Sequence, residues 1–236
     1  MQQEATEPTF KKKRHASMLV VLGITGLLAI VLIVYFAALV SRNNKNSNSD
    51  AGLINSVATE SVATDDDPYG GNKDARIVIV EFSDFQCPYC FQSFPVVREI
   101  LSTYGDHIKV IYRDFPLTDL HPDAQKAAEA AQCAHAQQKF WEYHDKLFVN
   151  RSDLSVTALK RYAAEVGLDA DVFSECLDSG SYDVEVQDDF TAGVAAGVDG
   201  TPTFFINDRR YDGAMTVDEL TYIIENLIAI YAGESP

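Results

Sequence analysis

A Cys-x-x-Cys pair, Cys87 and Cys90, lies where a buried strand gives way to an amphipathic helix. The apolar run at 76–82 predicts the strand, and apolar residues at helical spacing predict a helix that ends near Tyr104. Backbone N–H groups at a helix N-terminus are unpaired and the dipole is positive there, so the thiolate of Cys87 is favoured over the thiol. Pro88 suits the first helical turn because it has no N–H to donate. The pattern predicts reversible dithiol–disulfide chemistry.

Two other interpretations of the pair are a zinc site and a structural disulfide. A structural zinc ion needs four ligands, usually from a second such pair. The only other cysteines, Cys133 and Cys176, are far apart in the sequence. A structural disulfide between Cys87 and Cys90 stays open, although the strand–motif–helix context favours redox chemistry. The sequence predicts no metal site and no cofactor.

Near the N-terminus, residues Met18–Val40 contain no charged side chain. As a helix this stretch is about 35 Å long, enough to cross the hydrocarbon core of a bilayer. The basic residues Lys11–Arg14 outnumber Arg42 and Lys45 on the other side, so residues 1–17 are predicted to stay in the cytoplasm. The chain is therefore predicted to be a single-pass membrane protein whose remainder is extracytoplasmic.

A cleaved signal peptide is the alternative for this N-terminal region. Its apolar stretch would be about 7–15 residues long and would be followed by a small-x-small cleavage site. Cleavage after Ala37 or Ala38 would place Tyr35 or Phe36 where a small residue is needed. Length and site chemistry therefore favour a retained anchor.

Residues 41–67 are rich in Asn, Ser, Ala, Thr and Asp, which predicts a flexible linker that reaches about 25–30 Å. The folded domain is predicted to span residues 68–236. The whole chain has a formal net charge of −16, and the basic excess is confined to its first 40 residues. Nucleic acid is therefore an unsuitable partner for the domain.

The remaining elements follow in order along the domain. A second strand is predicted at 108–112, and a helical insert at about 122–197. The segment Gly200-Thr201-Pro202-Thr203 leads into a buried strand, which a short strand at 209–211 follows. A capping box, Thr216 to Glu219, opens a final helix.

This order of elements resembles the thioredoxin fold, an α/β architecture. The redox helix with its internal Pro95, the helical insert with the run Phe-Trp-Glu-Tyr-His-Asp-Lys-Leu-Phe at 140–148, and the Gly-Thr-Pro-Thr-Phe-Phe segment resemble the DsbA-like thiol–disulfide oxidoreductases in particular. The likeness covers about residues 68–232. Cys-x-x-Cys alone is moderately specific, but its combination with the Thr-Pro strand after a helical insert is strongly so.

The resemblance implies a role for each matching residue. Cys87 would be the exposed nucleophile, and Cys90 the buried thiol that resolves mixed disulfides. Thr201-Pro202 would be a cis-proline loop facing the disulfide, where backbone can pair with an extended substrate; an ordinary trans proline is the alternative. Glu81 would be a buried acid that aids proton movement; a solvent-facing strand residue is the alternative.

The residues between the two cysteines differ from the pattern of the family, and this difference affects the expected direction of electron flow. Strongly oxidising members of the family often have His between the cysteines, whereas this chain has the neutral Tyr89 after Pro88. A weaker oxidant is therefore expected. Cys133 and Cys176, both in the insert, are expected to form a structural disulfide, because an extracytoplasmic chain with four cysteines can pair them all. Two separate buried thiols are the alternative.

Together these features predict an enzyme that introduces disulfides into secreted or surface proteins. Its partners would be unfolded or reduced secreted proteins, the membrane through Met18–Val40, and a membrane quinone-linked thiol oxidase that reoxidises it. A disulfide reductase or isomerase with the same residues is the main alternative. A tethered, non-enzymatic domain that holds unfolded chains or Cu(I) is a third interpretation.

Overall fold

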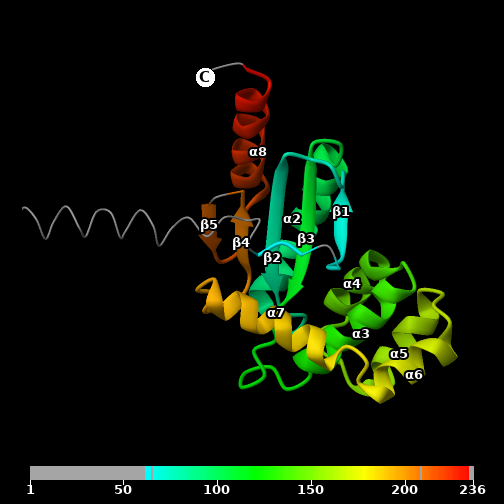
Figure 1. Cartoon of the computed structure of the whole chain (residues 1–236). Coiled ribbons are helices and arrows are strands. Elements are labelled where there is room, and N and C mark those ends of the chain that lie inside the picture. Colours follow the sequence, from blue (N-terminus) through cyan, green and yellow to red (C-terminus); the bar gives the residue numbers. More distant parts are fainter. Residues whose placement is uncertain (1–61, 65, 208, 234–236) are drawn as a thin grey trace, which may run out of the picture. The chain divides into compact units, whose positions relative to one another are not determined.

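Five strands form one mixed sheet in the computed structural model (Figure 1), which describes residues 62–64, 66–207 and 209–233. The strand order is β1-β3-β2-β4-β5, in which β2 and β3 are parallel and the other neighbours antiparallel. The strands are β1 (Tyr69–Gly71), β2 (Ile77–Ser83), β3 (Ile108–Asp114), β4 (Thr203–Ile206) and β5 (Arg209–Asp212).

The three central strands are buried on both faces. Their residues are almost all inaccessible, as expected for strands with continuous runs of Val, Ile and Phe rather than alternation. The described helices are α2 (Pro88–Tyr104), α3 (Ala124–Ala136), α4 (Phe140–Val149), α5 (Val156–Glu165), α6 (Ala170–Ser179), α7 (Asp183–Ala195) and α8 (Val217–Tyr231), of which α2, α7 and α8 contact the central strands.

Each face of the sheet has its own apolar core. On one face α2 and α8 pack over β2, β3 and β4, with Val97, Ile100 and Ile224 buried between the layers. On the other face, the core joins Phe82 and Phe115 to Phe190 of α7. The sequence analysis assigned the residues of α7 to the helical insert, and in the structure this helix also packs on the sheet.

Close packing of α7 on the sheet depends on Gly193. A Cβ atom at this position would lie 2.7 Å from the Phe115 ring and 3.0 Å from the Phe82 ring. Both rings are buried, so neither can move aside without repacking the core. The glycine therefore allows the helix backbone to approach the two aromatic rings.

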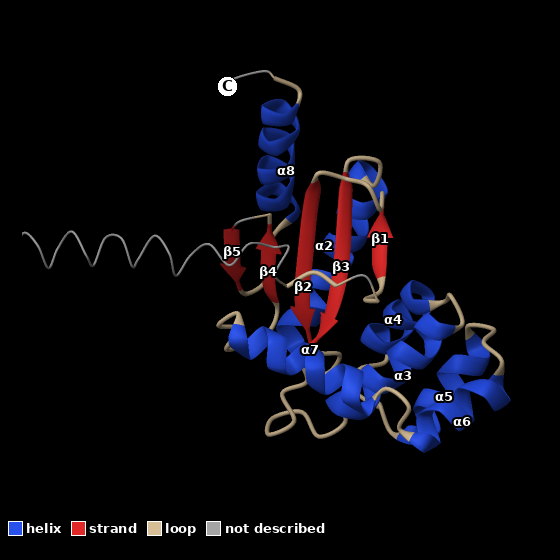
Figure 2. Cartoon of the chain, viewed as in Figure 1, coloured by secondary structure: helices blue, strands red, loops and turns tan. Residues whose placement is uncertain are grey.

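Helices α3 to α6 form a group of their own beside the sheet (Figure 2). Its core is rich in aromatic residues and alanine, and it includes Tyr143 and Phe148 of α4 together with Phe173 of α6. This core also contains Cys87 and Cys90. The α/β thioredoxin-like fold with a helical insertion, as predicted, is confirmed, and the insert is built from α3 to α7.

The chain divides into two units, and all described residues belong to the second, 55–236. The predicted cytoplasmic segment 1–17 and membrane helix Met18–Val40 lie outside the described residues, as does most of the linker 41–67. In the part of the chain that is described, no helix has the length and apolarity needed to cross a bilayer.

The predicted end of the linker at residue 67 is corrected by the structure. Val62 is 2% exposed and packs in the core beneath α7. Asp67 is also buried, and its carboxylate pairs with Arg113 of β3 at 3.2 Å. Residues 62–64 and 66–67 therefore belong to the domain, because the apolar packing of Val62, the hydrogen bond from Arg113 to its carbonyl and the Asp67–Arg113 ion pair hold them on the sheet. The polar composition of residues 41–67 predicted a linker, because composition alone gives no information about contacts with distant residues.

Strand β1 is the element that the sequence analysis did not predict. It has only three residues, two of them glycine, so it carries no apolar alternation. It pairs with β3, Tyr69 opposite Ile111. The Tyr69 carbonyl accepts a hydrogen bond from the indole N–H of Trp141 in α4 at 2.8 Å, which ties the helical insert to the sheet edge.

Candidate redox site

Cys87 and Cys90, the predicted redox pair, lie at the junction of β2 and α2, where the sequence placed them. Cys87 is the N-cap of α2, with extended backbone angles of φ −66° and ψ 127°, and Pro88 begins the helix. Proline disfavours a helical conformation in the residue before it, so the helix cannot extend back through Cys87. The Cys87 N–H donates to the Asp84 carbonyl at 3.0 Å. These constraints place the Cys87 sulfur at the positive end of the helix dipole.

The Thr201–Pro202 loop lies against this sulfur. The Thr201–Pro202 peptide bond is cis, as the family resemblance implied, and not the trans bond of the alternative. The Cys87 sulfur lies 3.3 Å from the Thr201 carbonyl oxygen, to which it donates a hydrogen bond when protonated. Antiparallel pairing of β4 with β2, with Thr203 opposite Phe82, brings the loop to the cysteine.

Both cysteines of the pair are free thiols in this structure, and both are buried. Cys90 is fully covered, as expected for the resolving thiol, but Cys87 is only 3% exposed. The expectation of an exposed Cys87 is therefore wrong for this conformation. The Thr201 carbonyl oxygen lies 3.3 Å from the sulfur and contributes to its burial.

The pKa values of the two thiols are shifted in opposite directions. The pKa of Cys87 is lowered to about 5, chiefly by the hydrogen bond from the Cys90 thiol, with further lowering by Thr201 and by the backbone N–H groups of Cys90 and Tyr89. Burial raises the pKa of Cys90 well above its ordinary value, and the neighbouring Cys87 raises it further. The pair therefore consists of one thiolate and one thiol at neutral pH.

Tyr89 has no charge to contribute to this thiolate. Its side chain is 59% exposed, on the surface beside the redox pair. The lowering of the Cys87 pKa comes from hydrogen bonds of neighbouring thiol, hydroxyl and backbone groups, none of which is cationic. The absence of His between the cysteines thus does not prevent a strongly acidic Cys87.

Glu81 lies inside the protein, behind the redox pair. It is 1% exposed, so the solvent-facing alternative is wrong. Burial raises its pKa to about 8, while the Ser83 hydroxyl opposes the rise. Glu81 also raises the pKa of Cys90 through its charge. A carboxyl group that titrates near neutral pH can exchange protons with a buried thiol.

Cys133 and Cys176 form a disulfide that joins α3 to α6. The Cα atoms are 6.0 Å apart, and 43 positions separate the residues. The pairing is the one that the sequence analysis favoured over two separate thiols. Because both sulfurs are bonded to each other, they cannot complete a four-thiolate zinc site with the Cys87–Cys90 pair.

Residues that the sequence analysis did not single out complete the site. Asp84 lies in the loop before Cys87, and its carboxylate pairs with the His121 ring at 2.7 Å. Gln86 exchanges two hydrogen bonds with Asp123. Asp84 stands within the redox motif, but nothing in the sequence indicates that its partner lies 37 positions further on.

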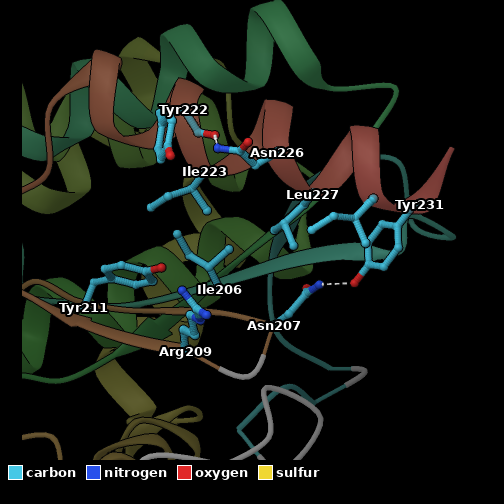
Figure 3. A pocket seen from close by; sticks show the side chains of 10 residues that line it. Ile206, Asn207, Arg209, Tyr211, Tyr222, Ile223, Asn226, Leu227 and Tyr231 are labelled. Atoms are coloured by element: carbon cyan, nitrogen blue, oxygen red, sulfur yellow. Dashed lines mark hydrogen bonds between the residues drawn. The ribbon is translucent and has the colours of Figure 1, made fainter. Parts of the chain in front are cut away.

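A cavity of about 380 Å³ lies between the β4–β5 hairpin and α8 (Figure 3). Apolar and aromatic side chains line most of it, and Asn207 crosses one end to bond the Tyr231 hydroxyl at 2.7 Å. None of the predicted redox residues borders this cavity. It is therefore separate from the dithiol.

Comparison with known families and proteins supports a thioredoxin-like assignment. The thioredoxin family model matches residues 63–226. The Na⁺/H⁺ antiporter NhaA 3 of Salinispora tropica is 40% identical over 168 residues, which are 71% of this chain and 26% of that protein. The chain thus spans about a quarter of the length of the curated relatives it matches.

Two solved structures have the same fold as the domain. A thioredoxin-like oxidoreductase from Silicibacter pomeroyi is 25% identical, with a TM-score of 0.64 over 70% of this chain and 94% of that one. BdbD from Bacillus subtilis is also 25% identical, with a TM-score of 0.62 and the same coverage of each chain.

Proposed function

The chain belongs to the thioredoxin family as a DsbA-like member, and on this premise we propose that it is an extracytoplasmic thiol–disulfide oxidoreductase held at the membrane by Met18–Val40. We propose further that it introduces disulfides into secreted or surface proteins. Antiport is the activity named for its curated relatives, and most of their length has no counterpart in this chain.

The contrast in acidity between the two thiols is the observation that carries this proposal. Cys87 has a pKa lowered to about 5, whereas the pKa of Cys90 is raised. A stabilised Cys87 thiolate stabilises the reduced form of the pair relative to the disulfide. A disulfide whose reduced form is stabilised is a strong oxidant, as it is in DsbA. This argument favours a disulfide donor over a reductase.

The reaction uses the pair as an acceptor of two electrons. A substrate thiolate attacks the Cys87 sulfur, a mixed disulfide forms, and the Cys87–Cys90 bond breaks with its electron pair on Cys90. A second substrate thiolate then attacks the substrate sulfur of the mixed disulfide and releases Cys87 as a thiolate. The substrate gains a disulfide, the enzyme is left reduced, and the protons pass to Cys90 and to solvent.

Reoxidation of the pair needs a second oxidant. A membrane quinone-linked thiol oxidase would accept the two electrons, and a membrane anchor would hold both proteins in one layer at a high effective concentration. The segment from residue 41 to the first described residues would set how far the domain moves from the bilayer.

Equilibration of the full chain with glutathione, in detergent, tests the direction of electron flow. A reduction potential of the Cys87–Cys90 pair near that of DsbA, about −120 mV, supports disulfide donation. A value near that of thioredoxin, about −270 mV, supports the reductase alternative instead. A variant with Cys133 and Cys176 both replaced by Ala shows that the measured change belongs to the redox pair.

A further inference from the structure

Asp84 contacts both redox cysteines through its backbone. Its N–H lies 3.5 Å from the Cys90 sulfur, which accepts the hydrogen bond, and its carbonyl accepts from the Cys87 N–H at 3.0 Å. The residue is 2% exposed. Any shift of its peptide groups would therefore change the surroundings of both sulfurs.

The carboxylate of Asp84 fixes this backbone. One oxygen accepts from the Gln86 N–H at 2.7 Å, and the other accepts from the Leu117 N–H at 2.9 Å. The second oxygen also pairs with His121 Nδ1 at 2.7 Å. A carboxylate can accept all three bonds, since each oxygen has two lone pairs. The side chain is fully covered, so water does not replace a partner that is lost.

A second contact joins the same two loops. The Gln86 amide oxygen accepts from the Asp123 N–H at 2.7 Å, and its amide nitrogen donates to the Asp123 carboxylate at 3.3 Å. The segment around His121 leads directly into α3 of the helical insert. The redox loop and the entry of the insert are thus held together at two points.

We propose that Asp84 is a positioning residue, which His121 and the Leu117 backbone hold so that its N–H points at the Cys90 sulfur. The inference rests on the proposed function and concerns the opening of the disulfide. When a thiolate attacks Cys87, the electron pair of the Cys87–Cys90 bond passes to Cys90, which bears negative charge until it takes a proton. An N–H already aimed at that sulfur stabilises the charge as it develops, without reorganisation.

The test compares Asp84→Asn with Asp189→Asn in the full chain. Asp189 is a matched control, because it too is buried, accepts a backbone N–H, from Asp114 at 2.9 Å, and pairs with a basic side chain. It contacts neither cysteine of the redox pair. In Asp84→Asn an NH₂ group takes the place of one carboxylate oxygen. That group cannot accept from the N–H donors that face it, so the loop must move.

The measurement is the second-order rate at which glutathione opens the oxidised pair, with near-UV circular dichroism to verify native aromatic packing. Asp84→Asn should slow opening on the order of tenfold, as expected when a hydrogen bond to a charged group is lost. Asp189→Asn should leave the rate within about twofold of the parent, although it too removes buried hydrogen bonds.

His121→Ala provides a second route to the answer if Asp84→Asn does not fold. It removes one of three donors to the carboxylate and should slow opening in the same direction, by a smaller factor. Rates within twofold of the parent in every folded Asp84 and His121 variant would overturn the inference, as would equal slowing by Asp189→Asn. A parent chain whose pair does not react with glutathione at all would contradict the proposed function instead.

Discussion

The sulfur of Cys87 lies 3.3 Å from the carbonyl oxygen of Thr201, although 114 positions separate the two residues. The contact closes the redox site, because it brings the strand–helix junction and the proline loop to the same edge of the sheet. The pairing of β2 with β4 produces it. The carbonyl of Thr201 thus lies directly against the Cys87 sulfur, which is 3% exposed.

Cys87 should titrate as a strongly acidic thiol. Thiolate absorbance at 240 nm in the reduced protein should show a midpoint near pH 5, the value to which the Cys87 pKa is lowered. In Cys90→Ala the midpoint should rise, because the hydrogen bond from the Cys90 thiol is the largest cause of the lowering. A midpoint in the range of ordinary thiols, between about 8 and 9, would contradict the assignment.

The same titration sets how the stability of the reduced protein depends on pH. The unfolded thiol titrates at its ordinary value of 9.0 and the folded one at about 5. The folded state therefore releases its proton first, so this stabilisation is complete above about pH 9 and is lost as the pH falls to about 5. Urea unfolding of the reduced and oxidised forms at several pH values measures the difference, which the oxidised form should lack.

Replacement of Glu81 by Gln should stabilise the domain at neutral pH. Burial raises the Glu81 pKa from 4.5 to about 8, so the carboxyl stabilises the fold fully below pH 4.5 and loses that contribution as the pH rises through 8. The free energy of unfolding of Glu81→Gln relative to the parent should therefore increase as the pH rises from 4.5 to 8, by at most about 5 kcal/mol. Urea unfolding at pH 4, 6 and 8 gives the comparison.

The exposed Glu99 of α2 provides the control for this experiment. Glu99→Gln should leave the free energy of unfolding within about 0.5 kcal/mol of the parent at each pH. An equal stability of Glu81→Gln and the parent at pH 8 would mean that Glu81 is not desolvated in the native protein.

Loss of the Cys133–Cys176 disulfide should lower the free energy of unfolding by about 3–4 kcal/mol. The bond closes a loop between residues 43 positions apart, so its removal gives conformational freedom back to the unfolded chain. Chemical denaturation of the double Ala variant measures the loss. In dithiothreitol the parent and the variant should have equal stability, which separates the effect of the bond from that of the substituted side chains.

Arg113→Met should destabilise the domain strongly. The Arg113 guanidinium lies between the buried carboxylates of Asp67 and Asp189, and it donates to the Val62 carbonyl at 2.8 Å. In the variant, the carboxylates of Asp67 and Asp189 are left without a cation. Removal of one partner of a buried ion pair lowers the free energy of unfolding by about 3–5 kcal/mol. Urea unfolding at pH 8 measures this loss.

The pH dependence of this loss identifies its cause. Burial raises the pKa of Asp189 to about 7, with Asp67 adding to the rise and Arg113 opposing it. Protonation can therefore relieve the unpaired charge, and the destabilisation should be smaller at pH 5.5 than at pH 8. Arg161→Met is the control, because its ion pairs with Asp153 and Glu165 are exposed and contribute at most about 1 kcal/mol.

The sequence by itself indicated the positions of the main elements and of the Cys87–Cys90 pair, and the family resemblance implied the fold. The apolar runs at 76–82 and 108–112 match β2 and β3 closely, and the capping box at Thr216 opens α8 as predicted. Local patterns were sufficient here, because hydrophobic periodicity and helix caps depend on residues close together in the chain. The Cys-Pro-Tyr-Cys motif was likewise predicted to lie where a strand gives way to a helix, and it lies at the start of α2, after β2.

Only the tertiary structure decided the environment of each functional group. Glu81 could face solvent or the interior, and burial between the sheet and the helices resolved the choice. The covering of Cys87 by Thr201, the pairing of Asp84 with His121 and the burial of Val62 all join distant segments. Desolvation and hydrogen bonds across such distances set the pKa values, and no local pattern in the chain encodes them.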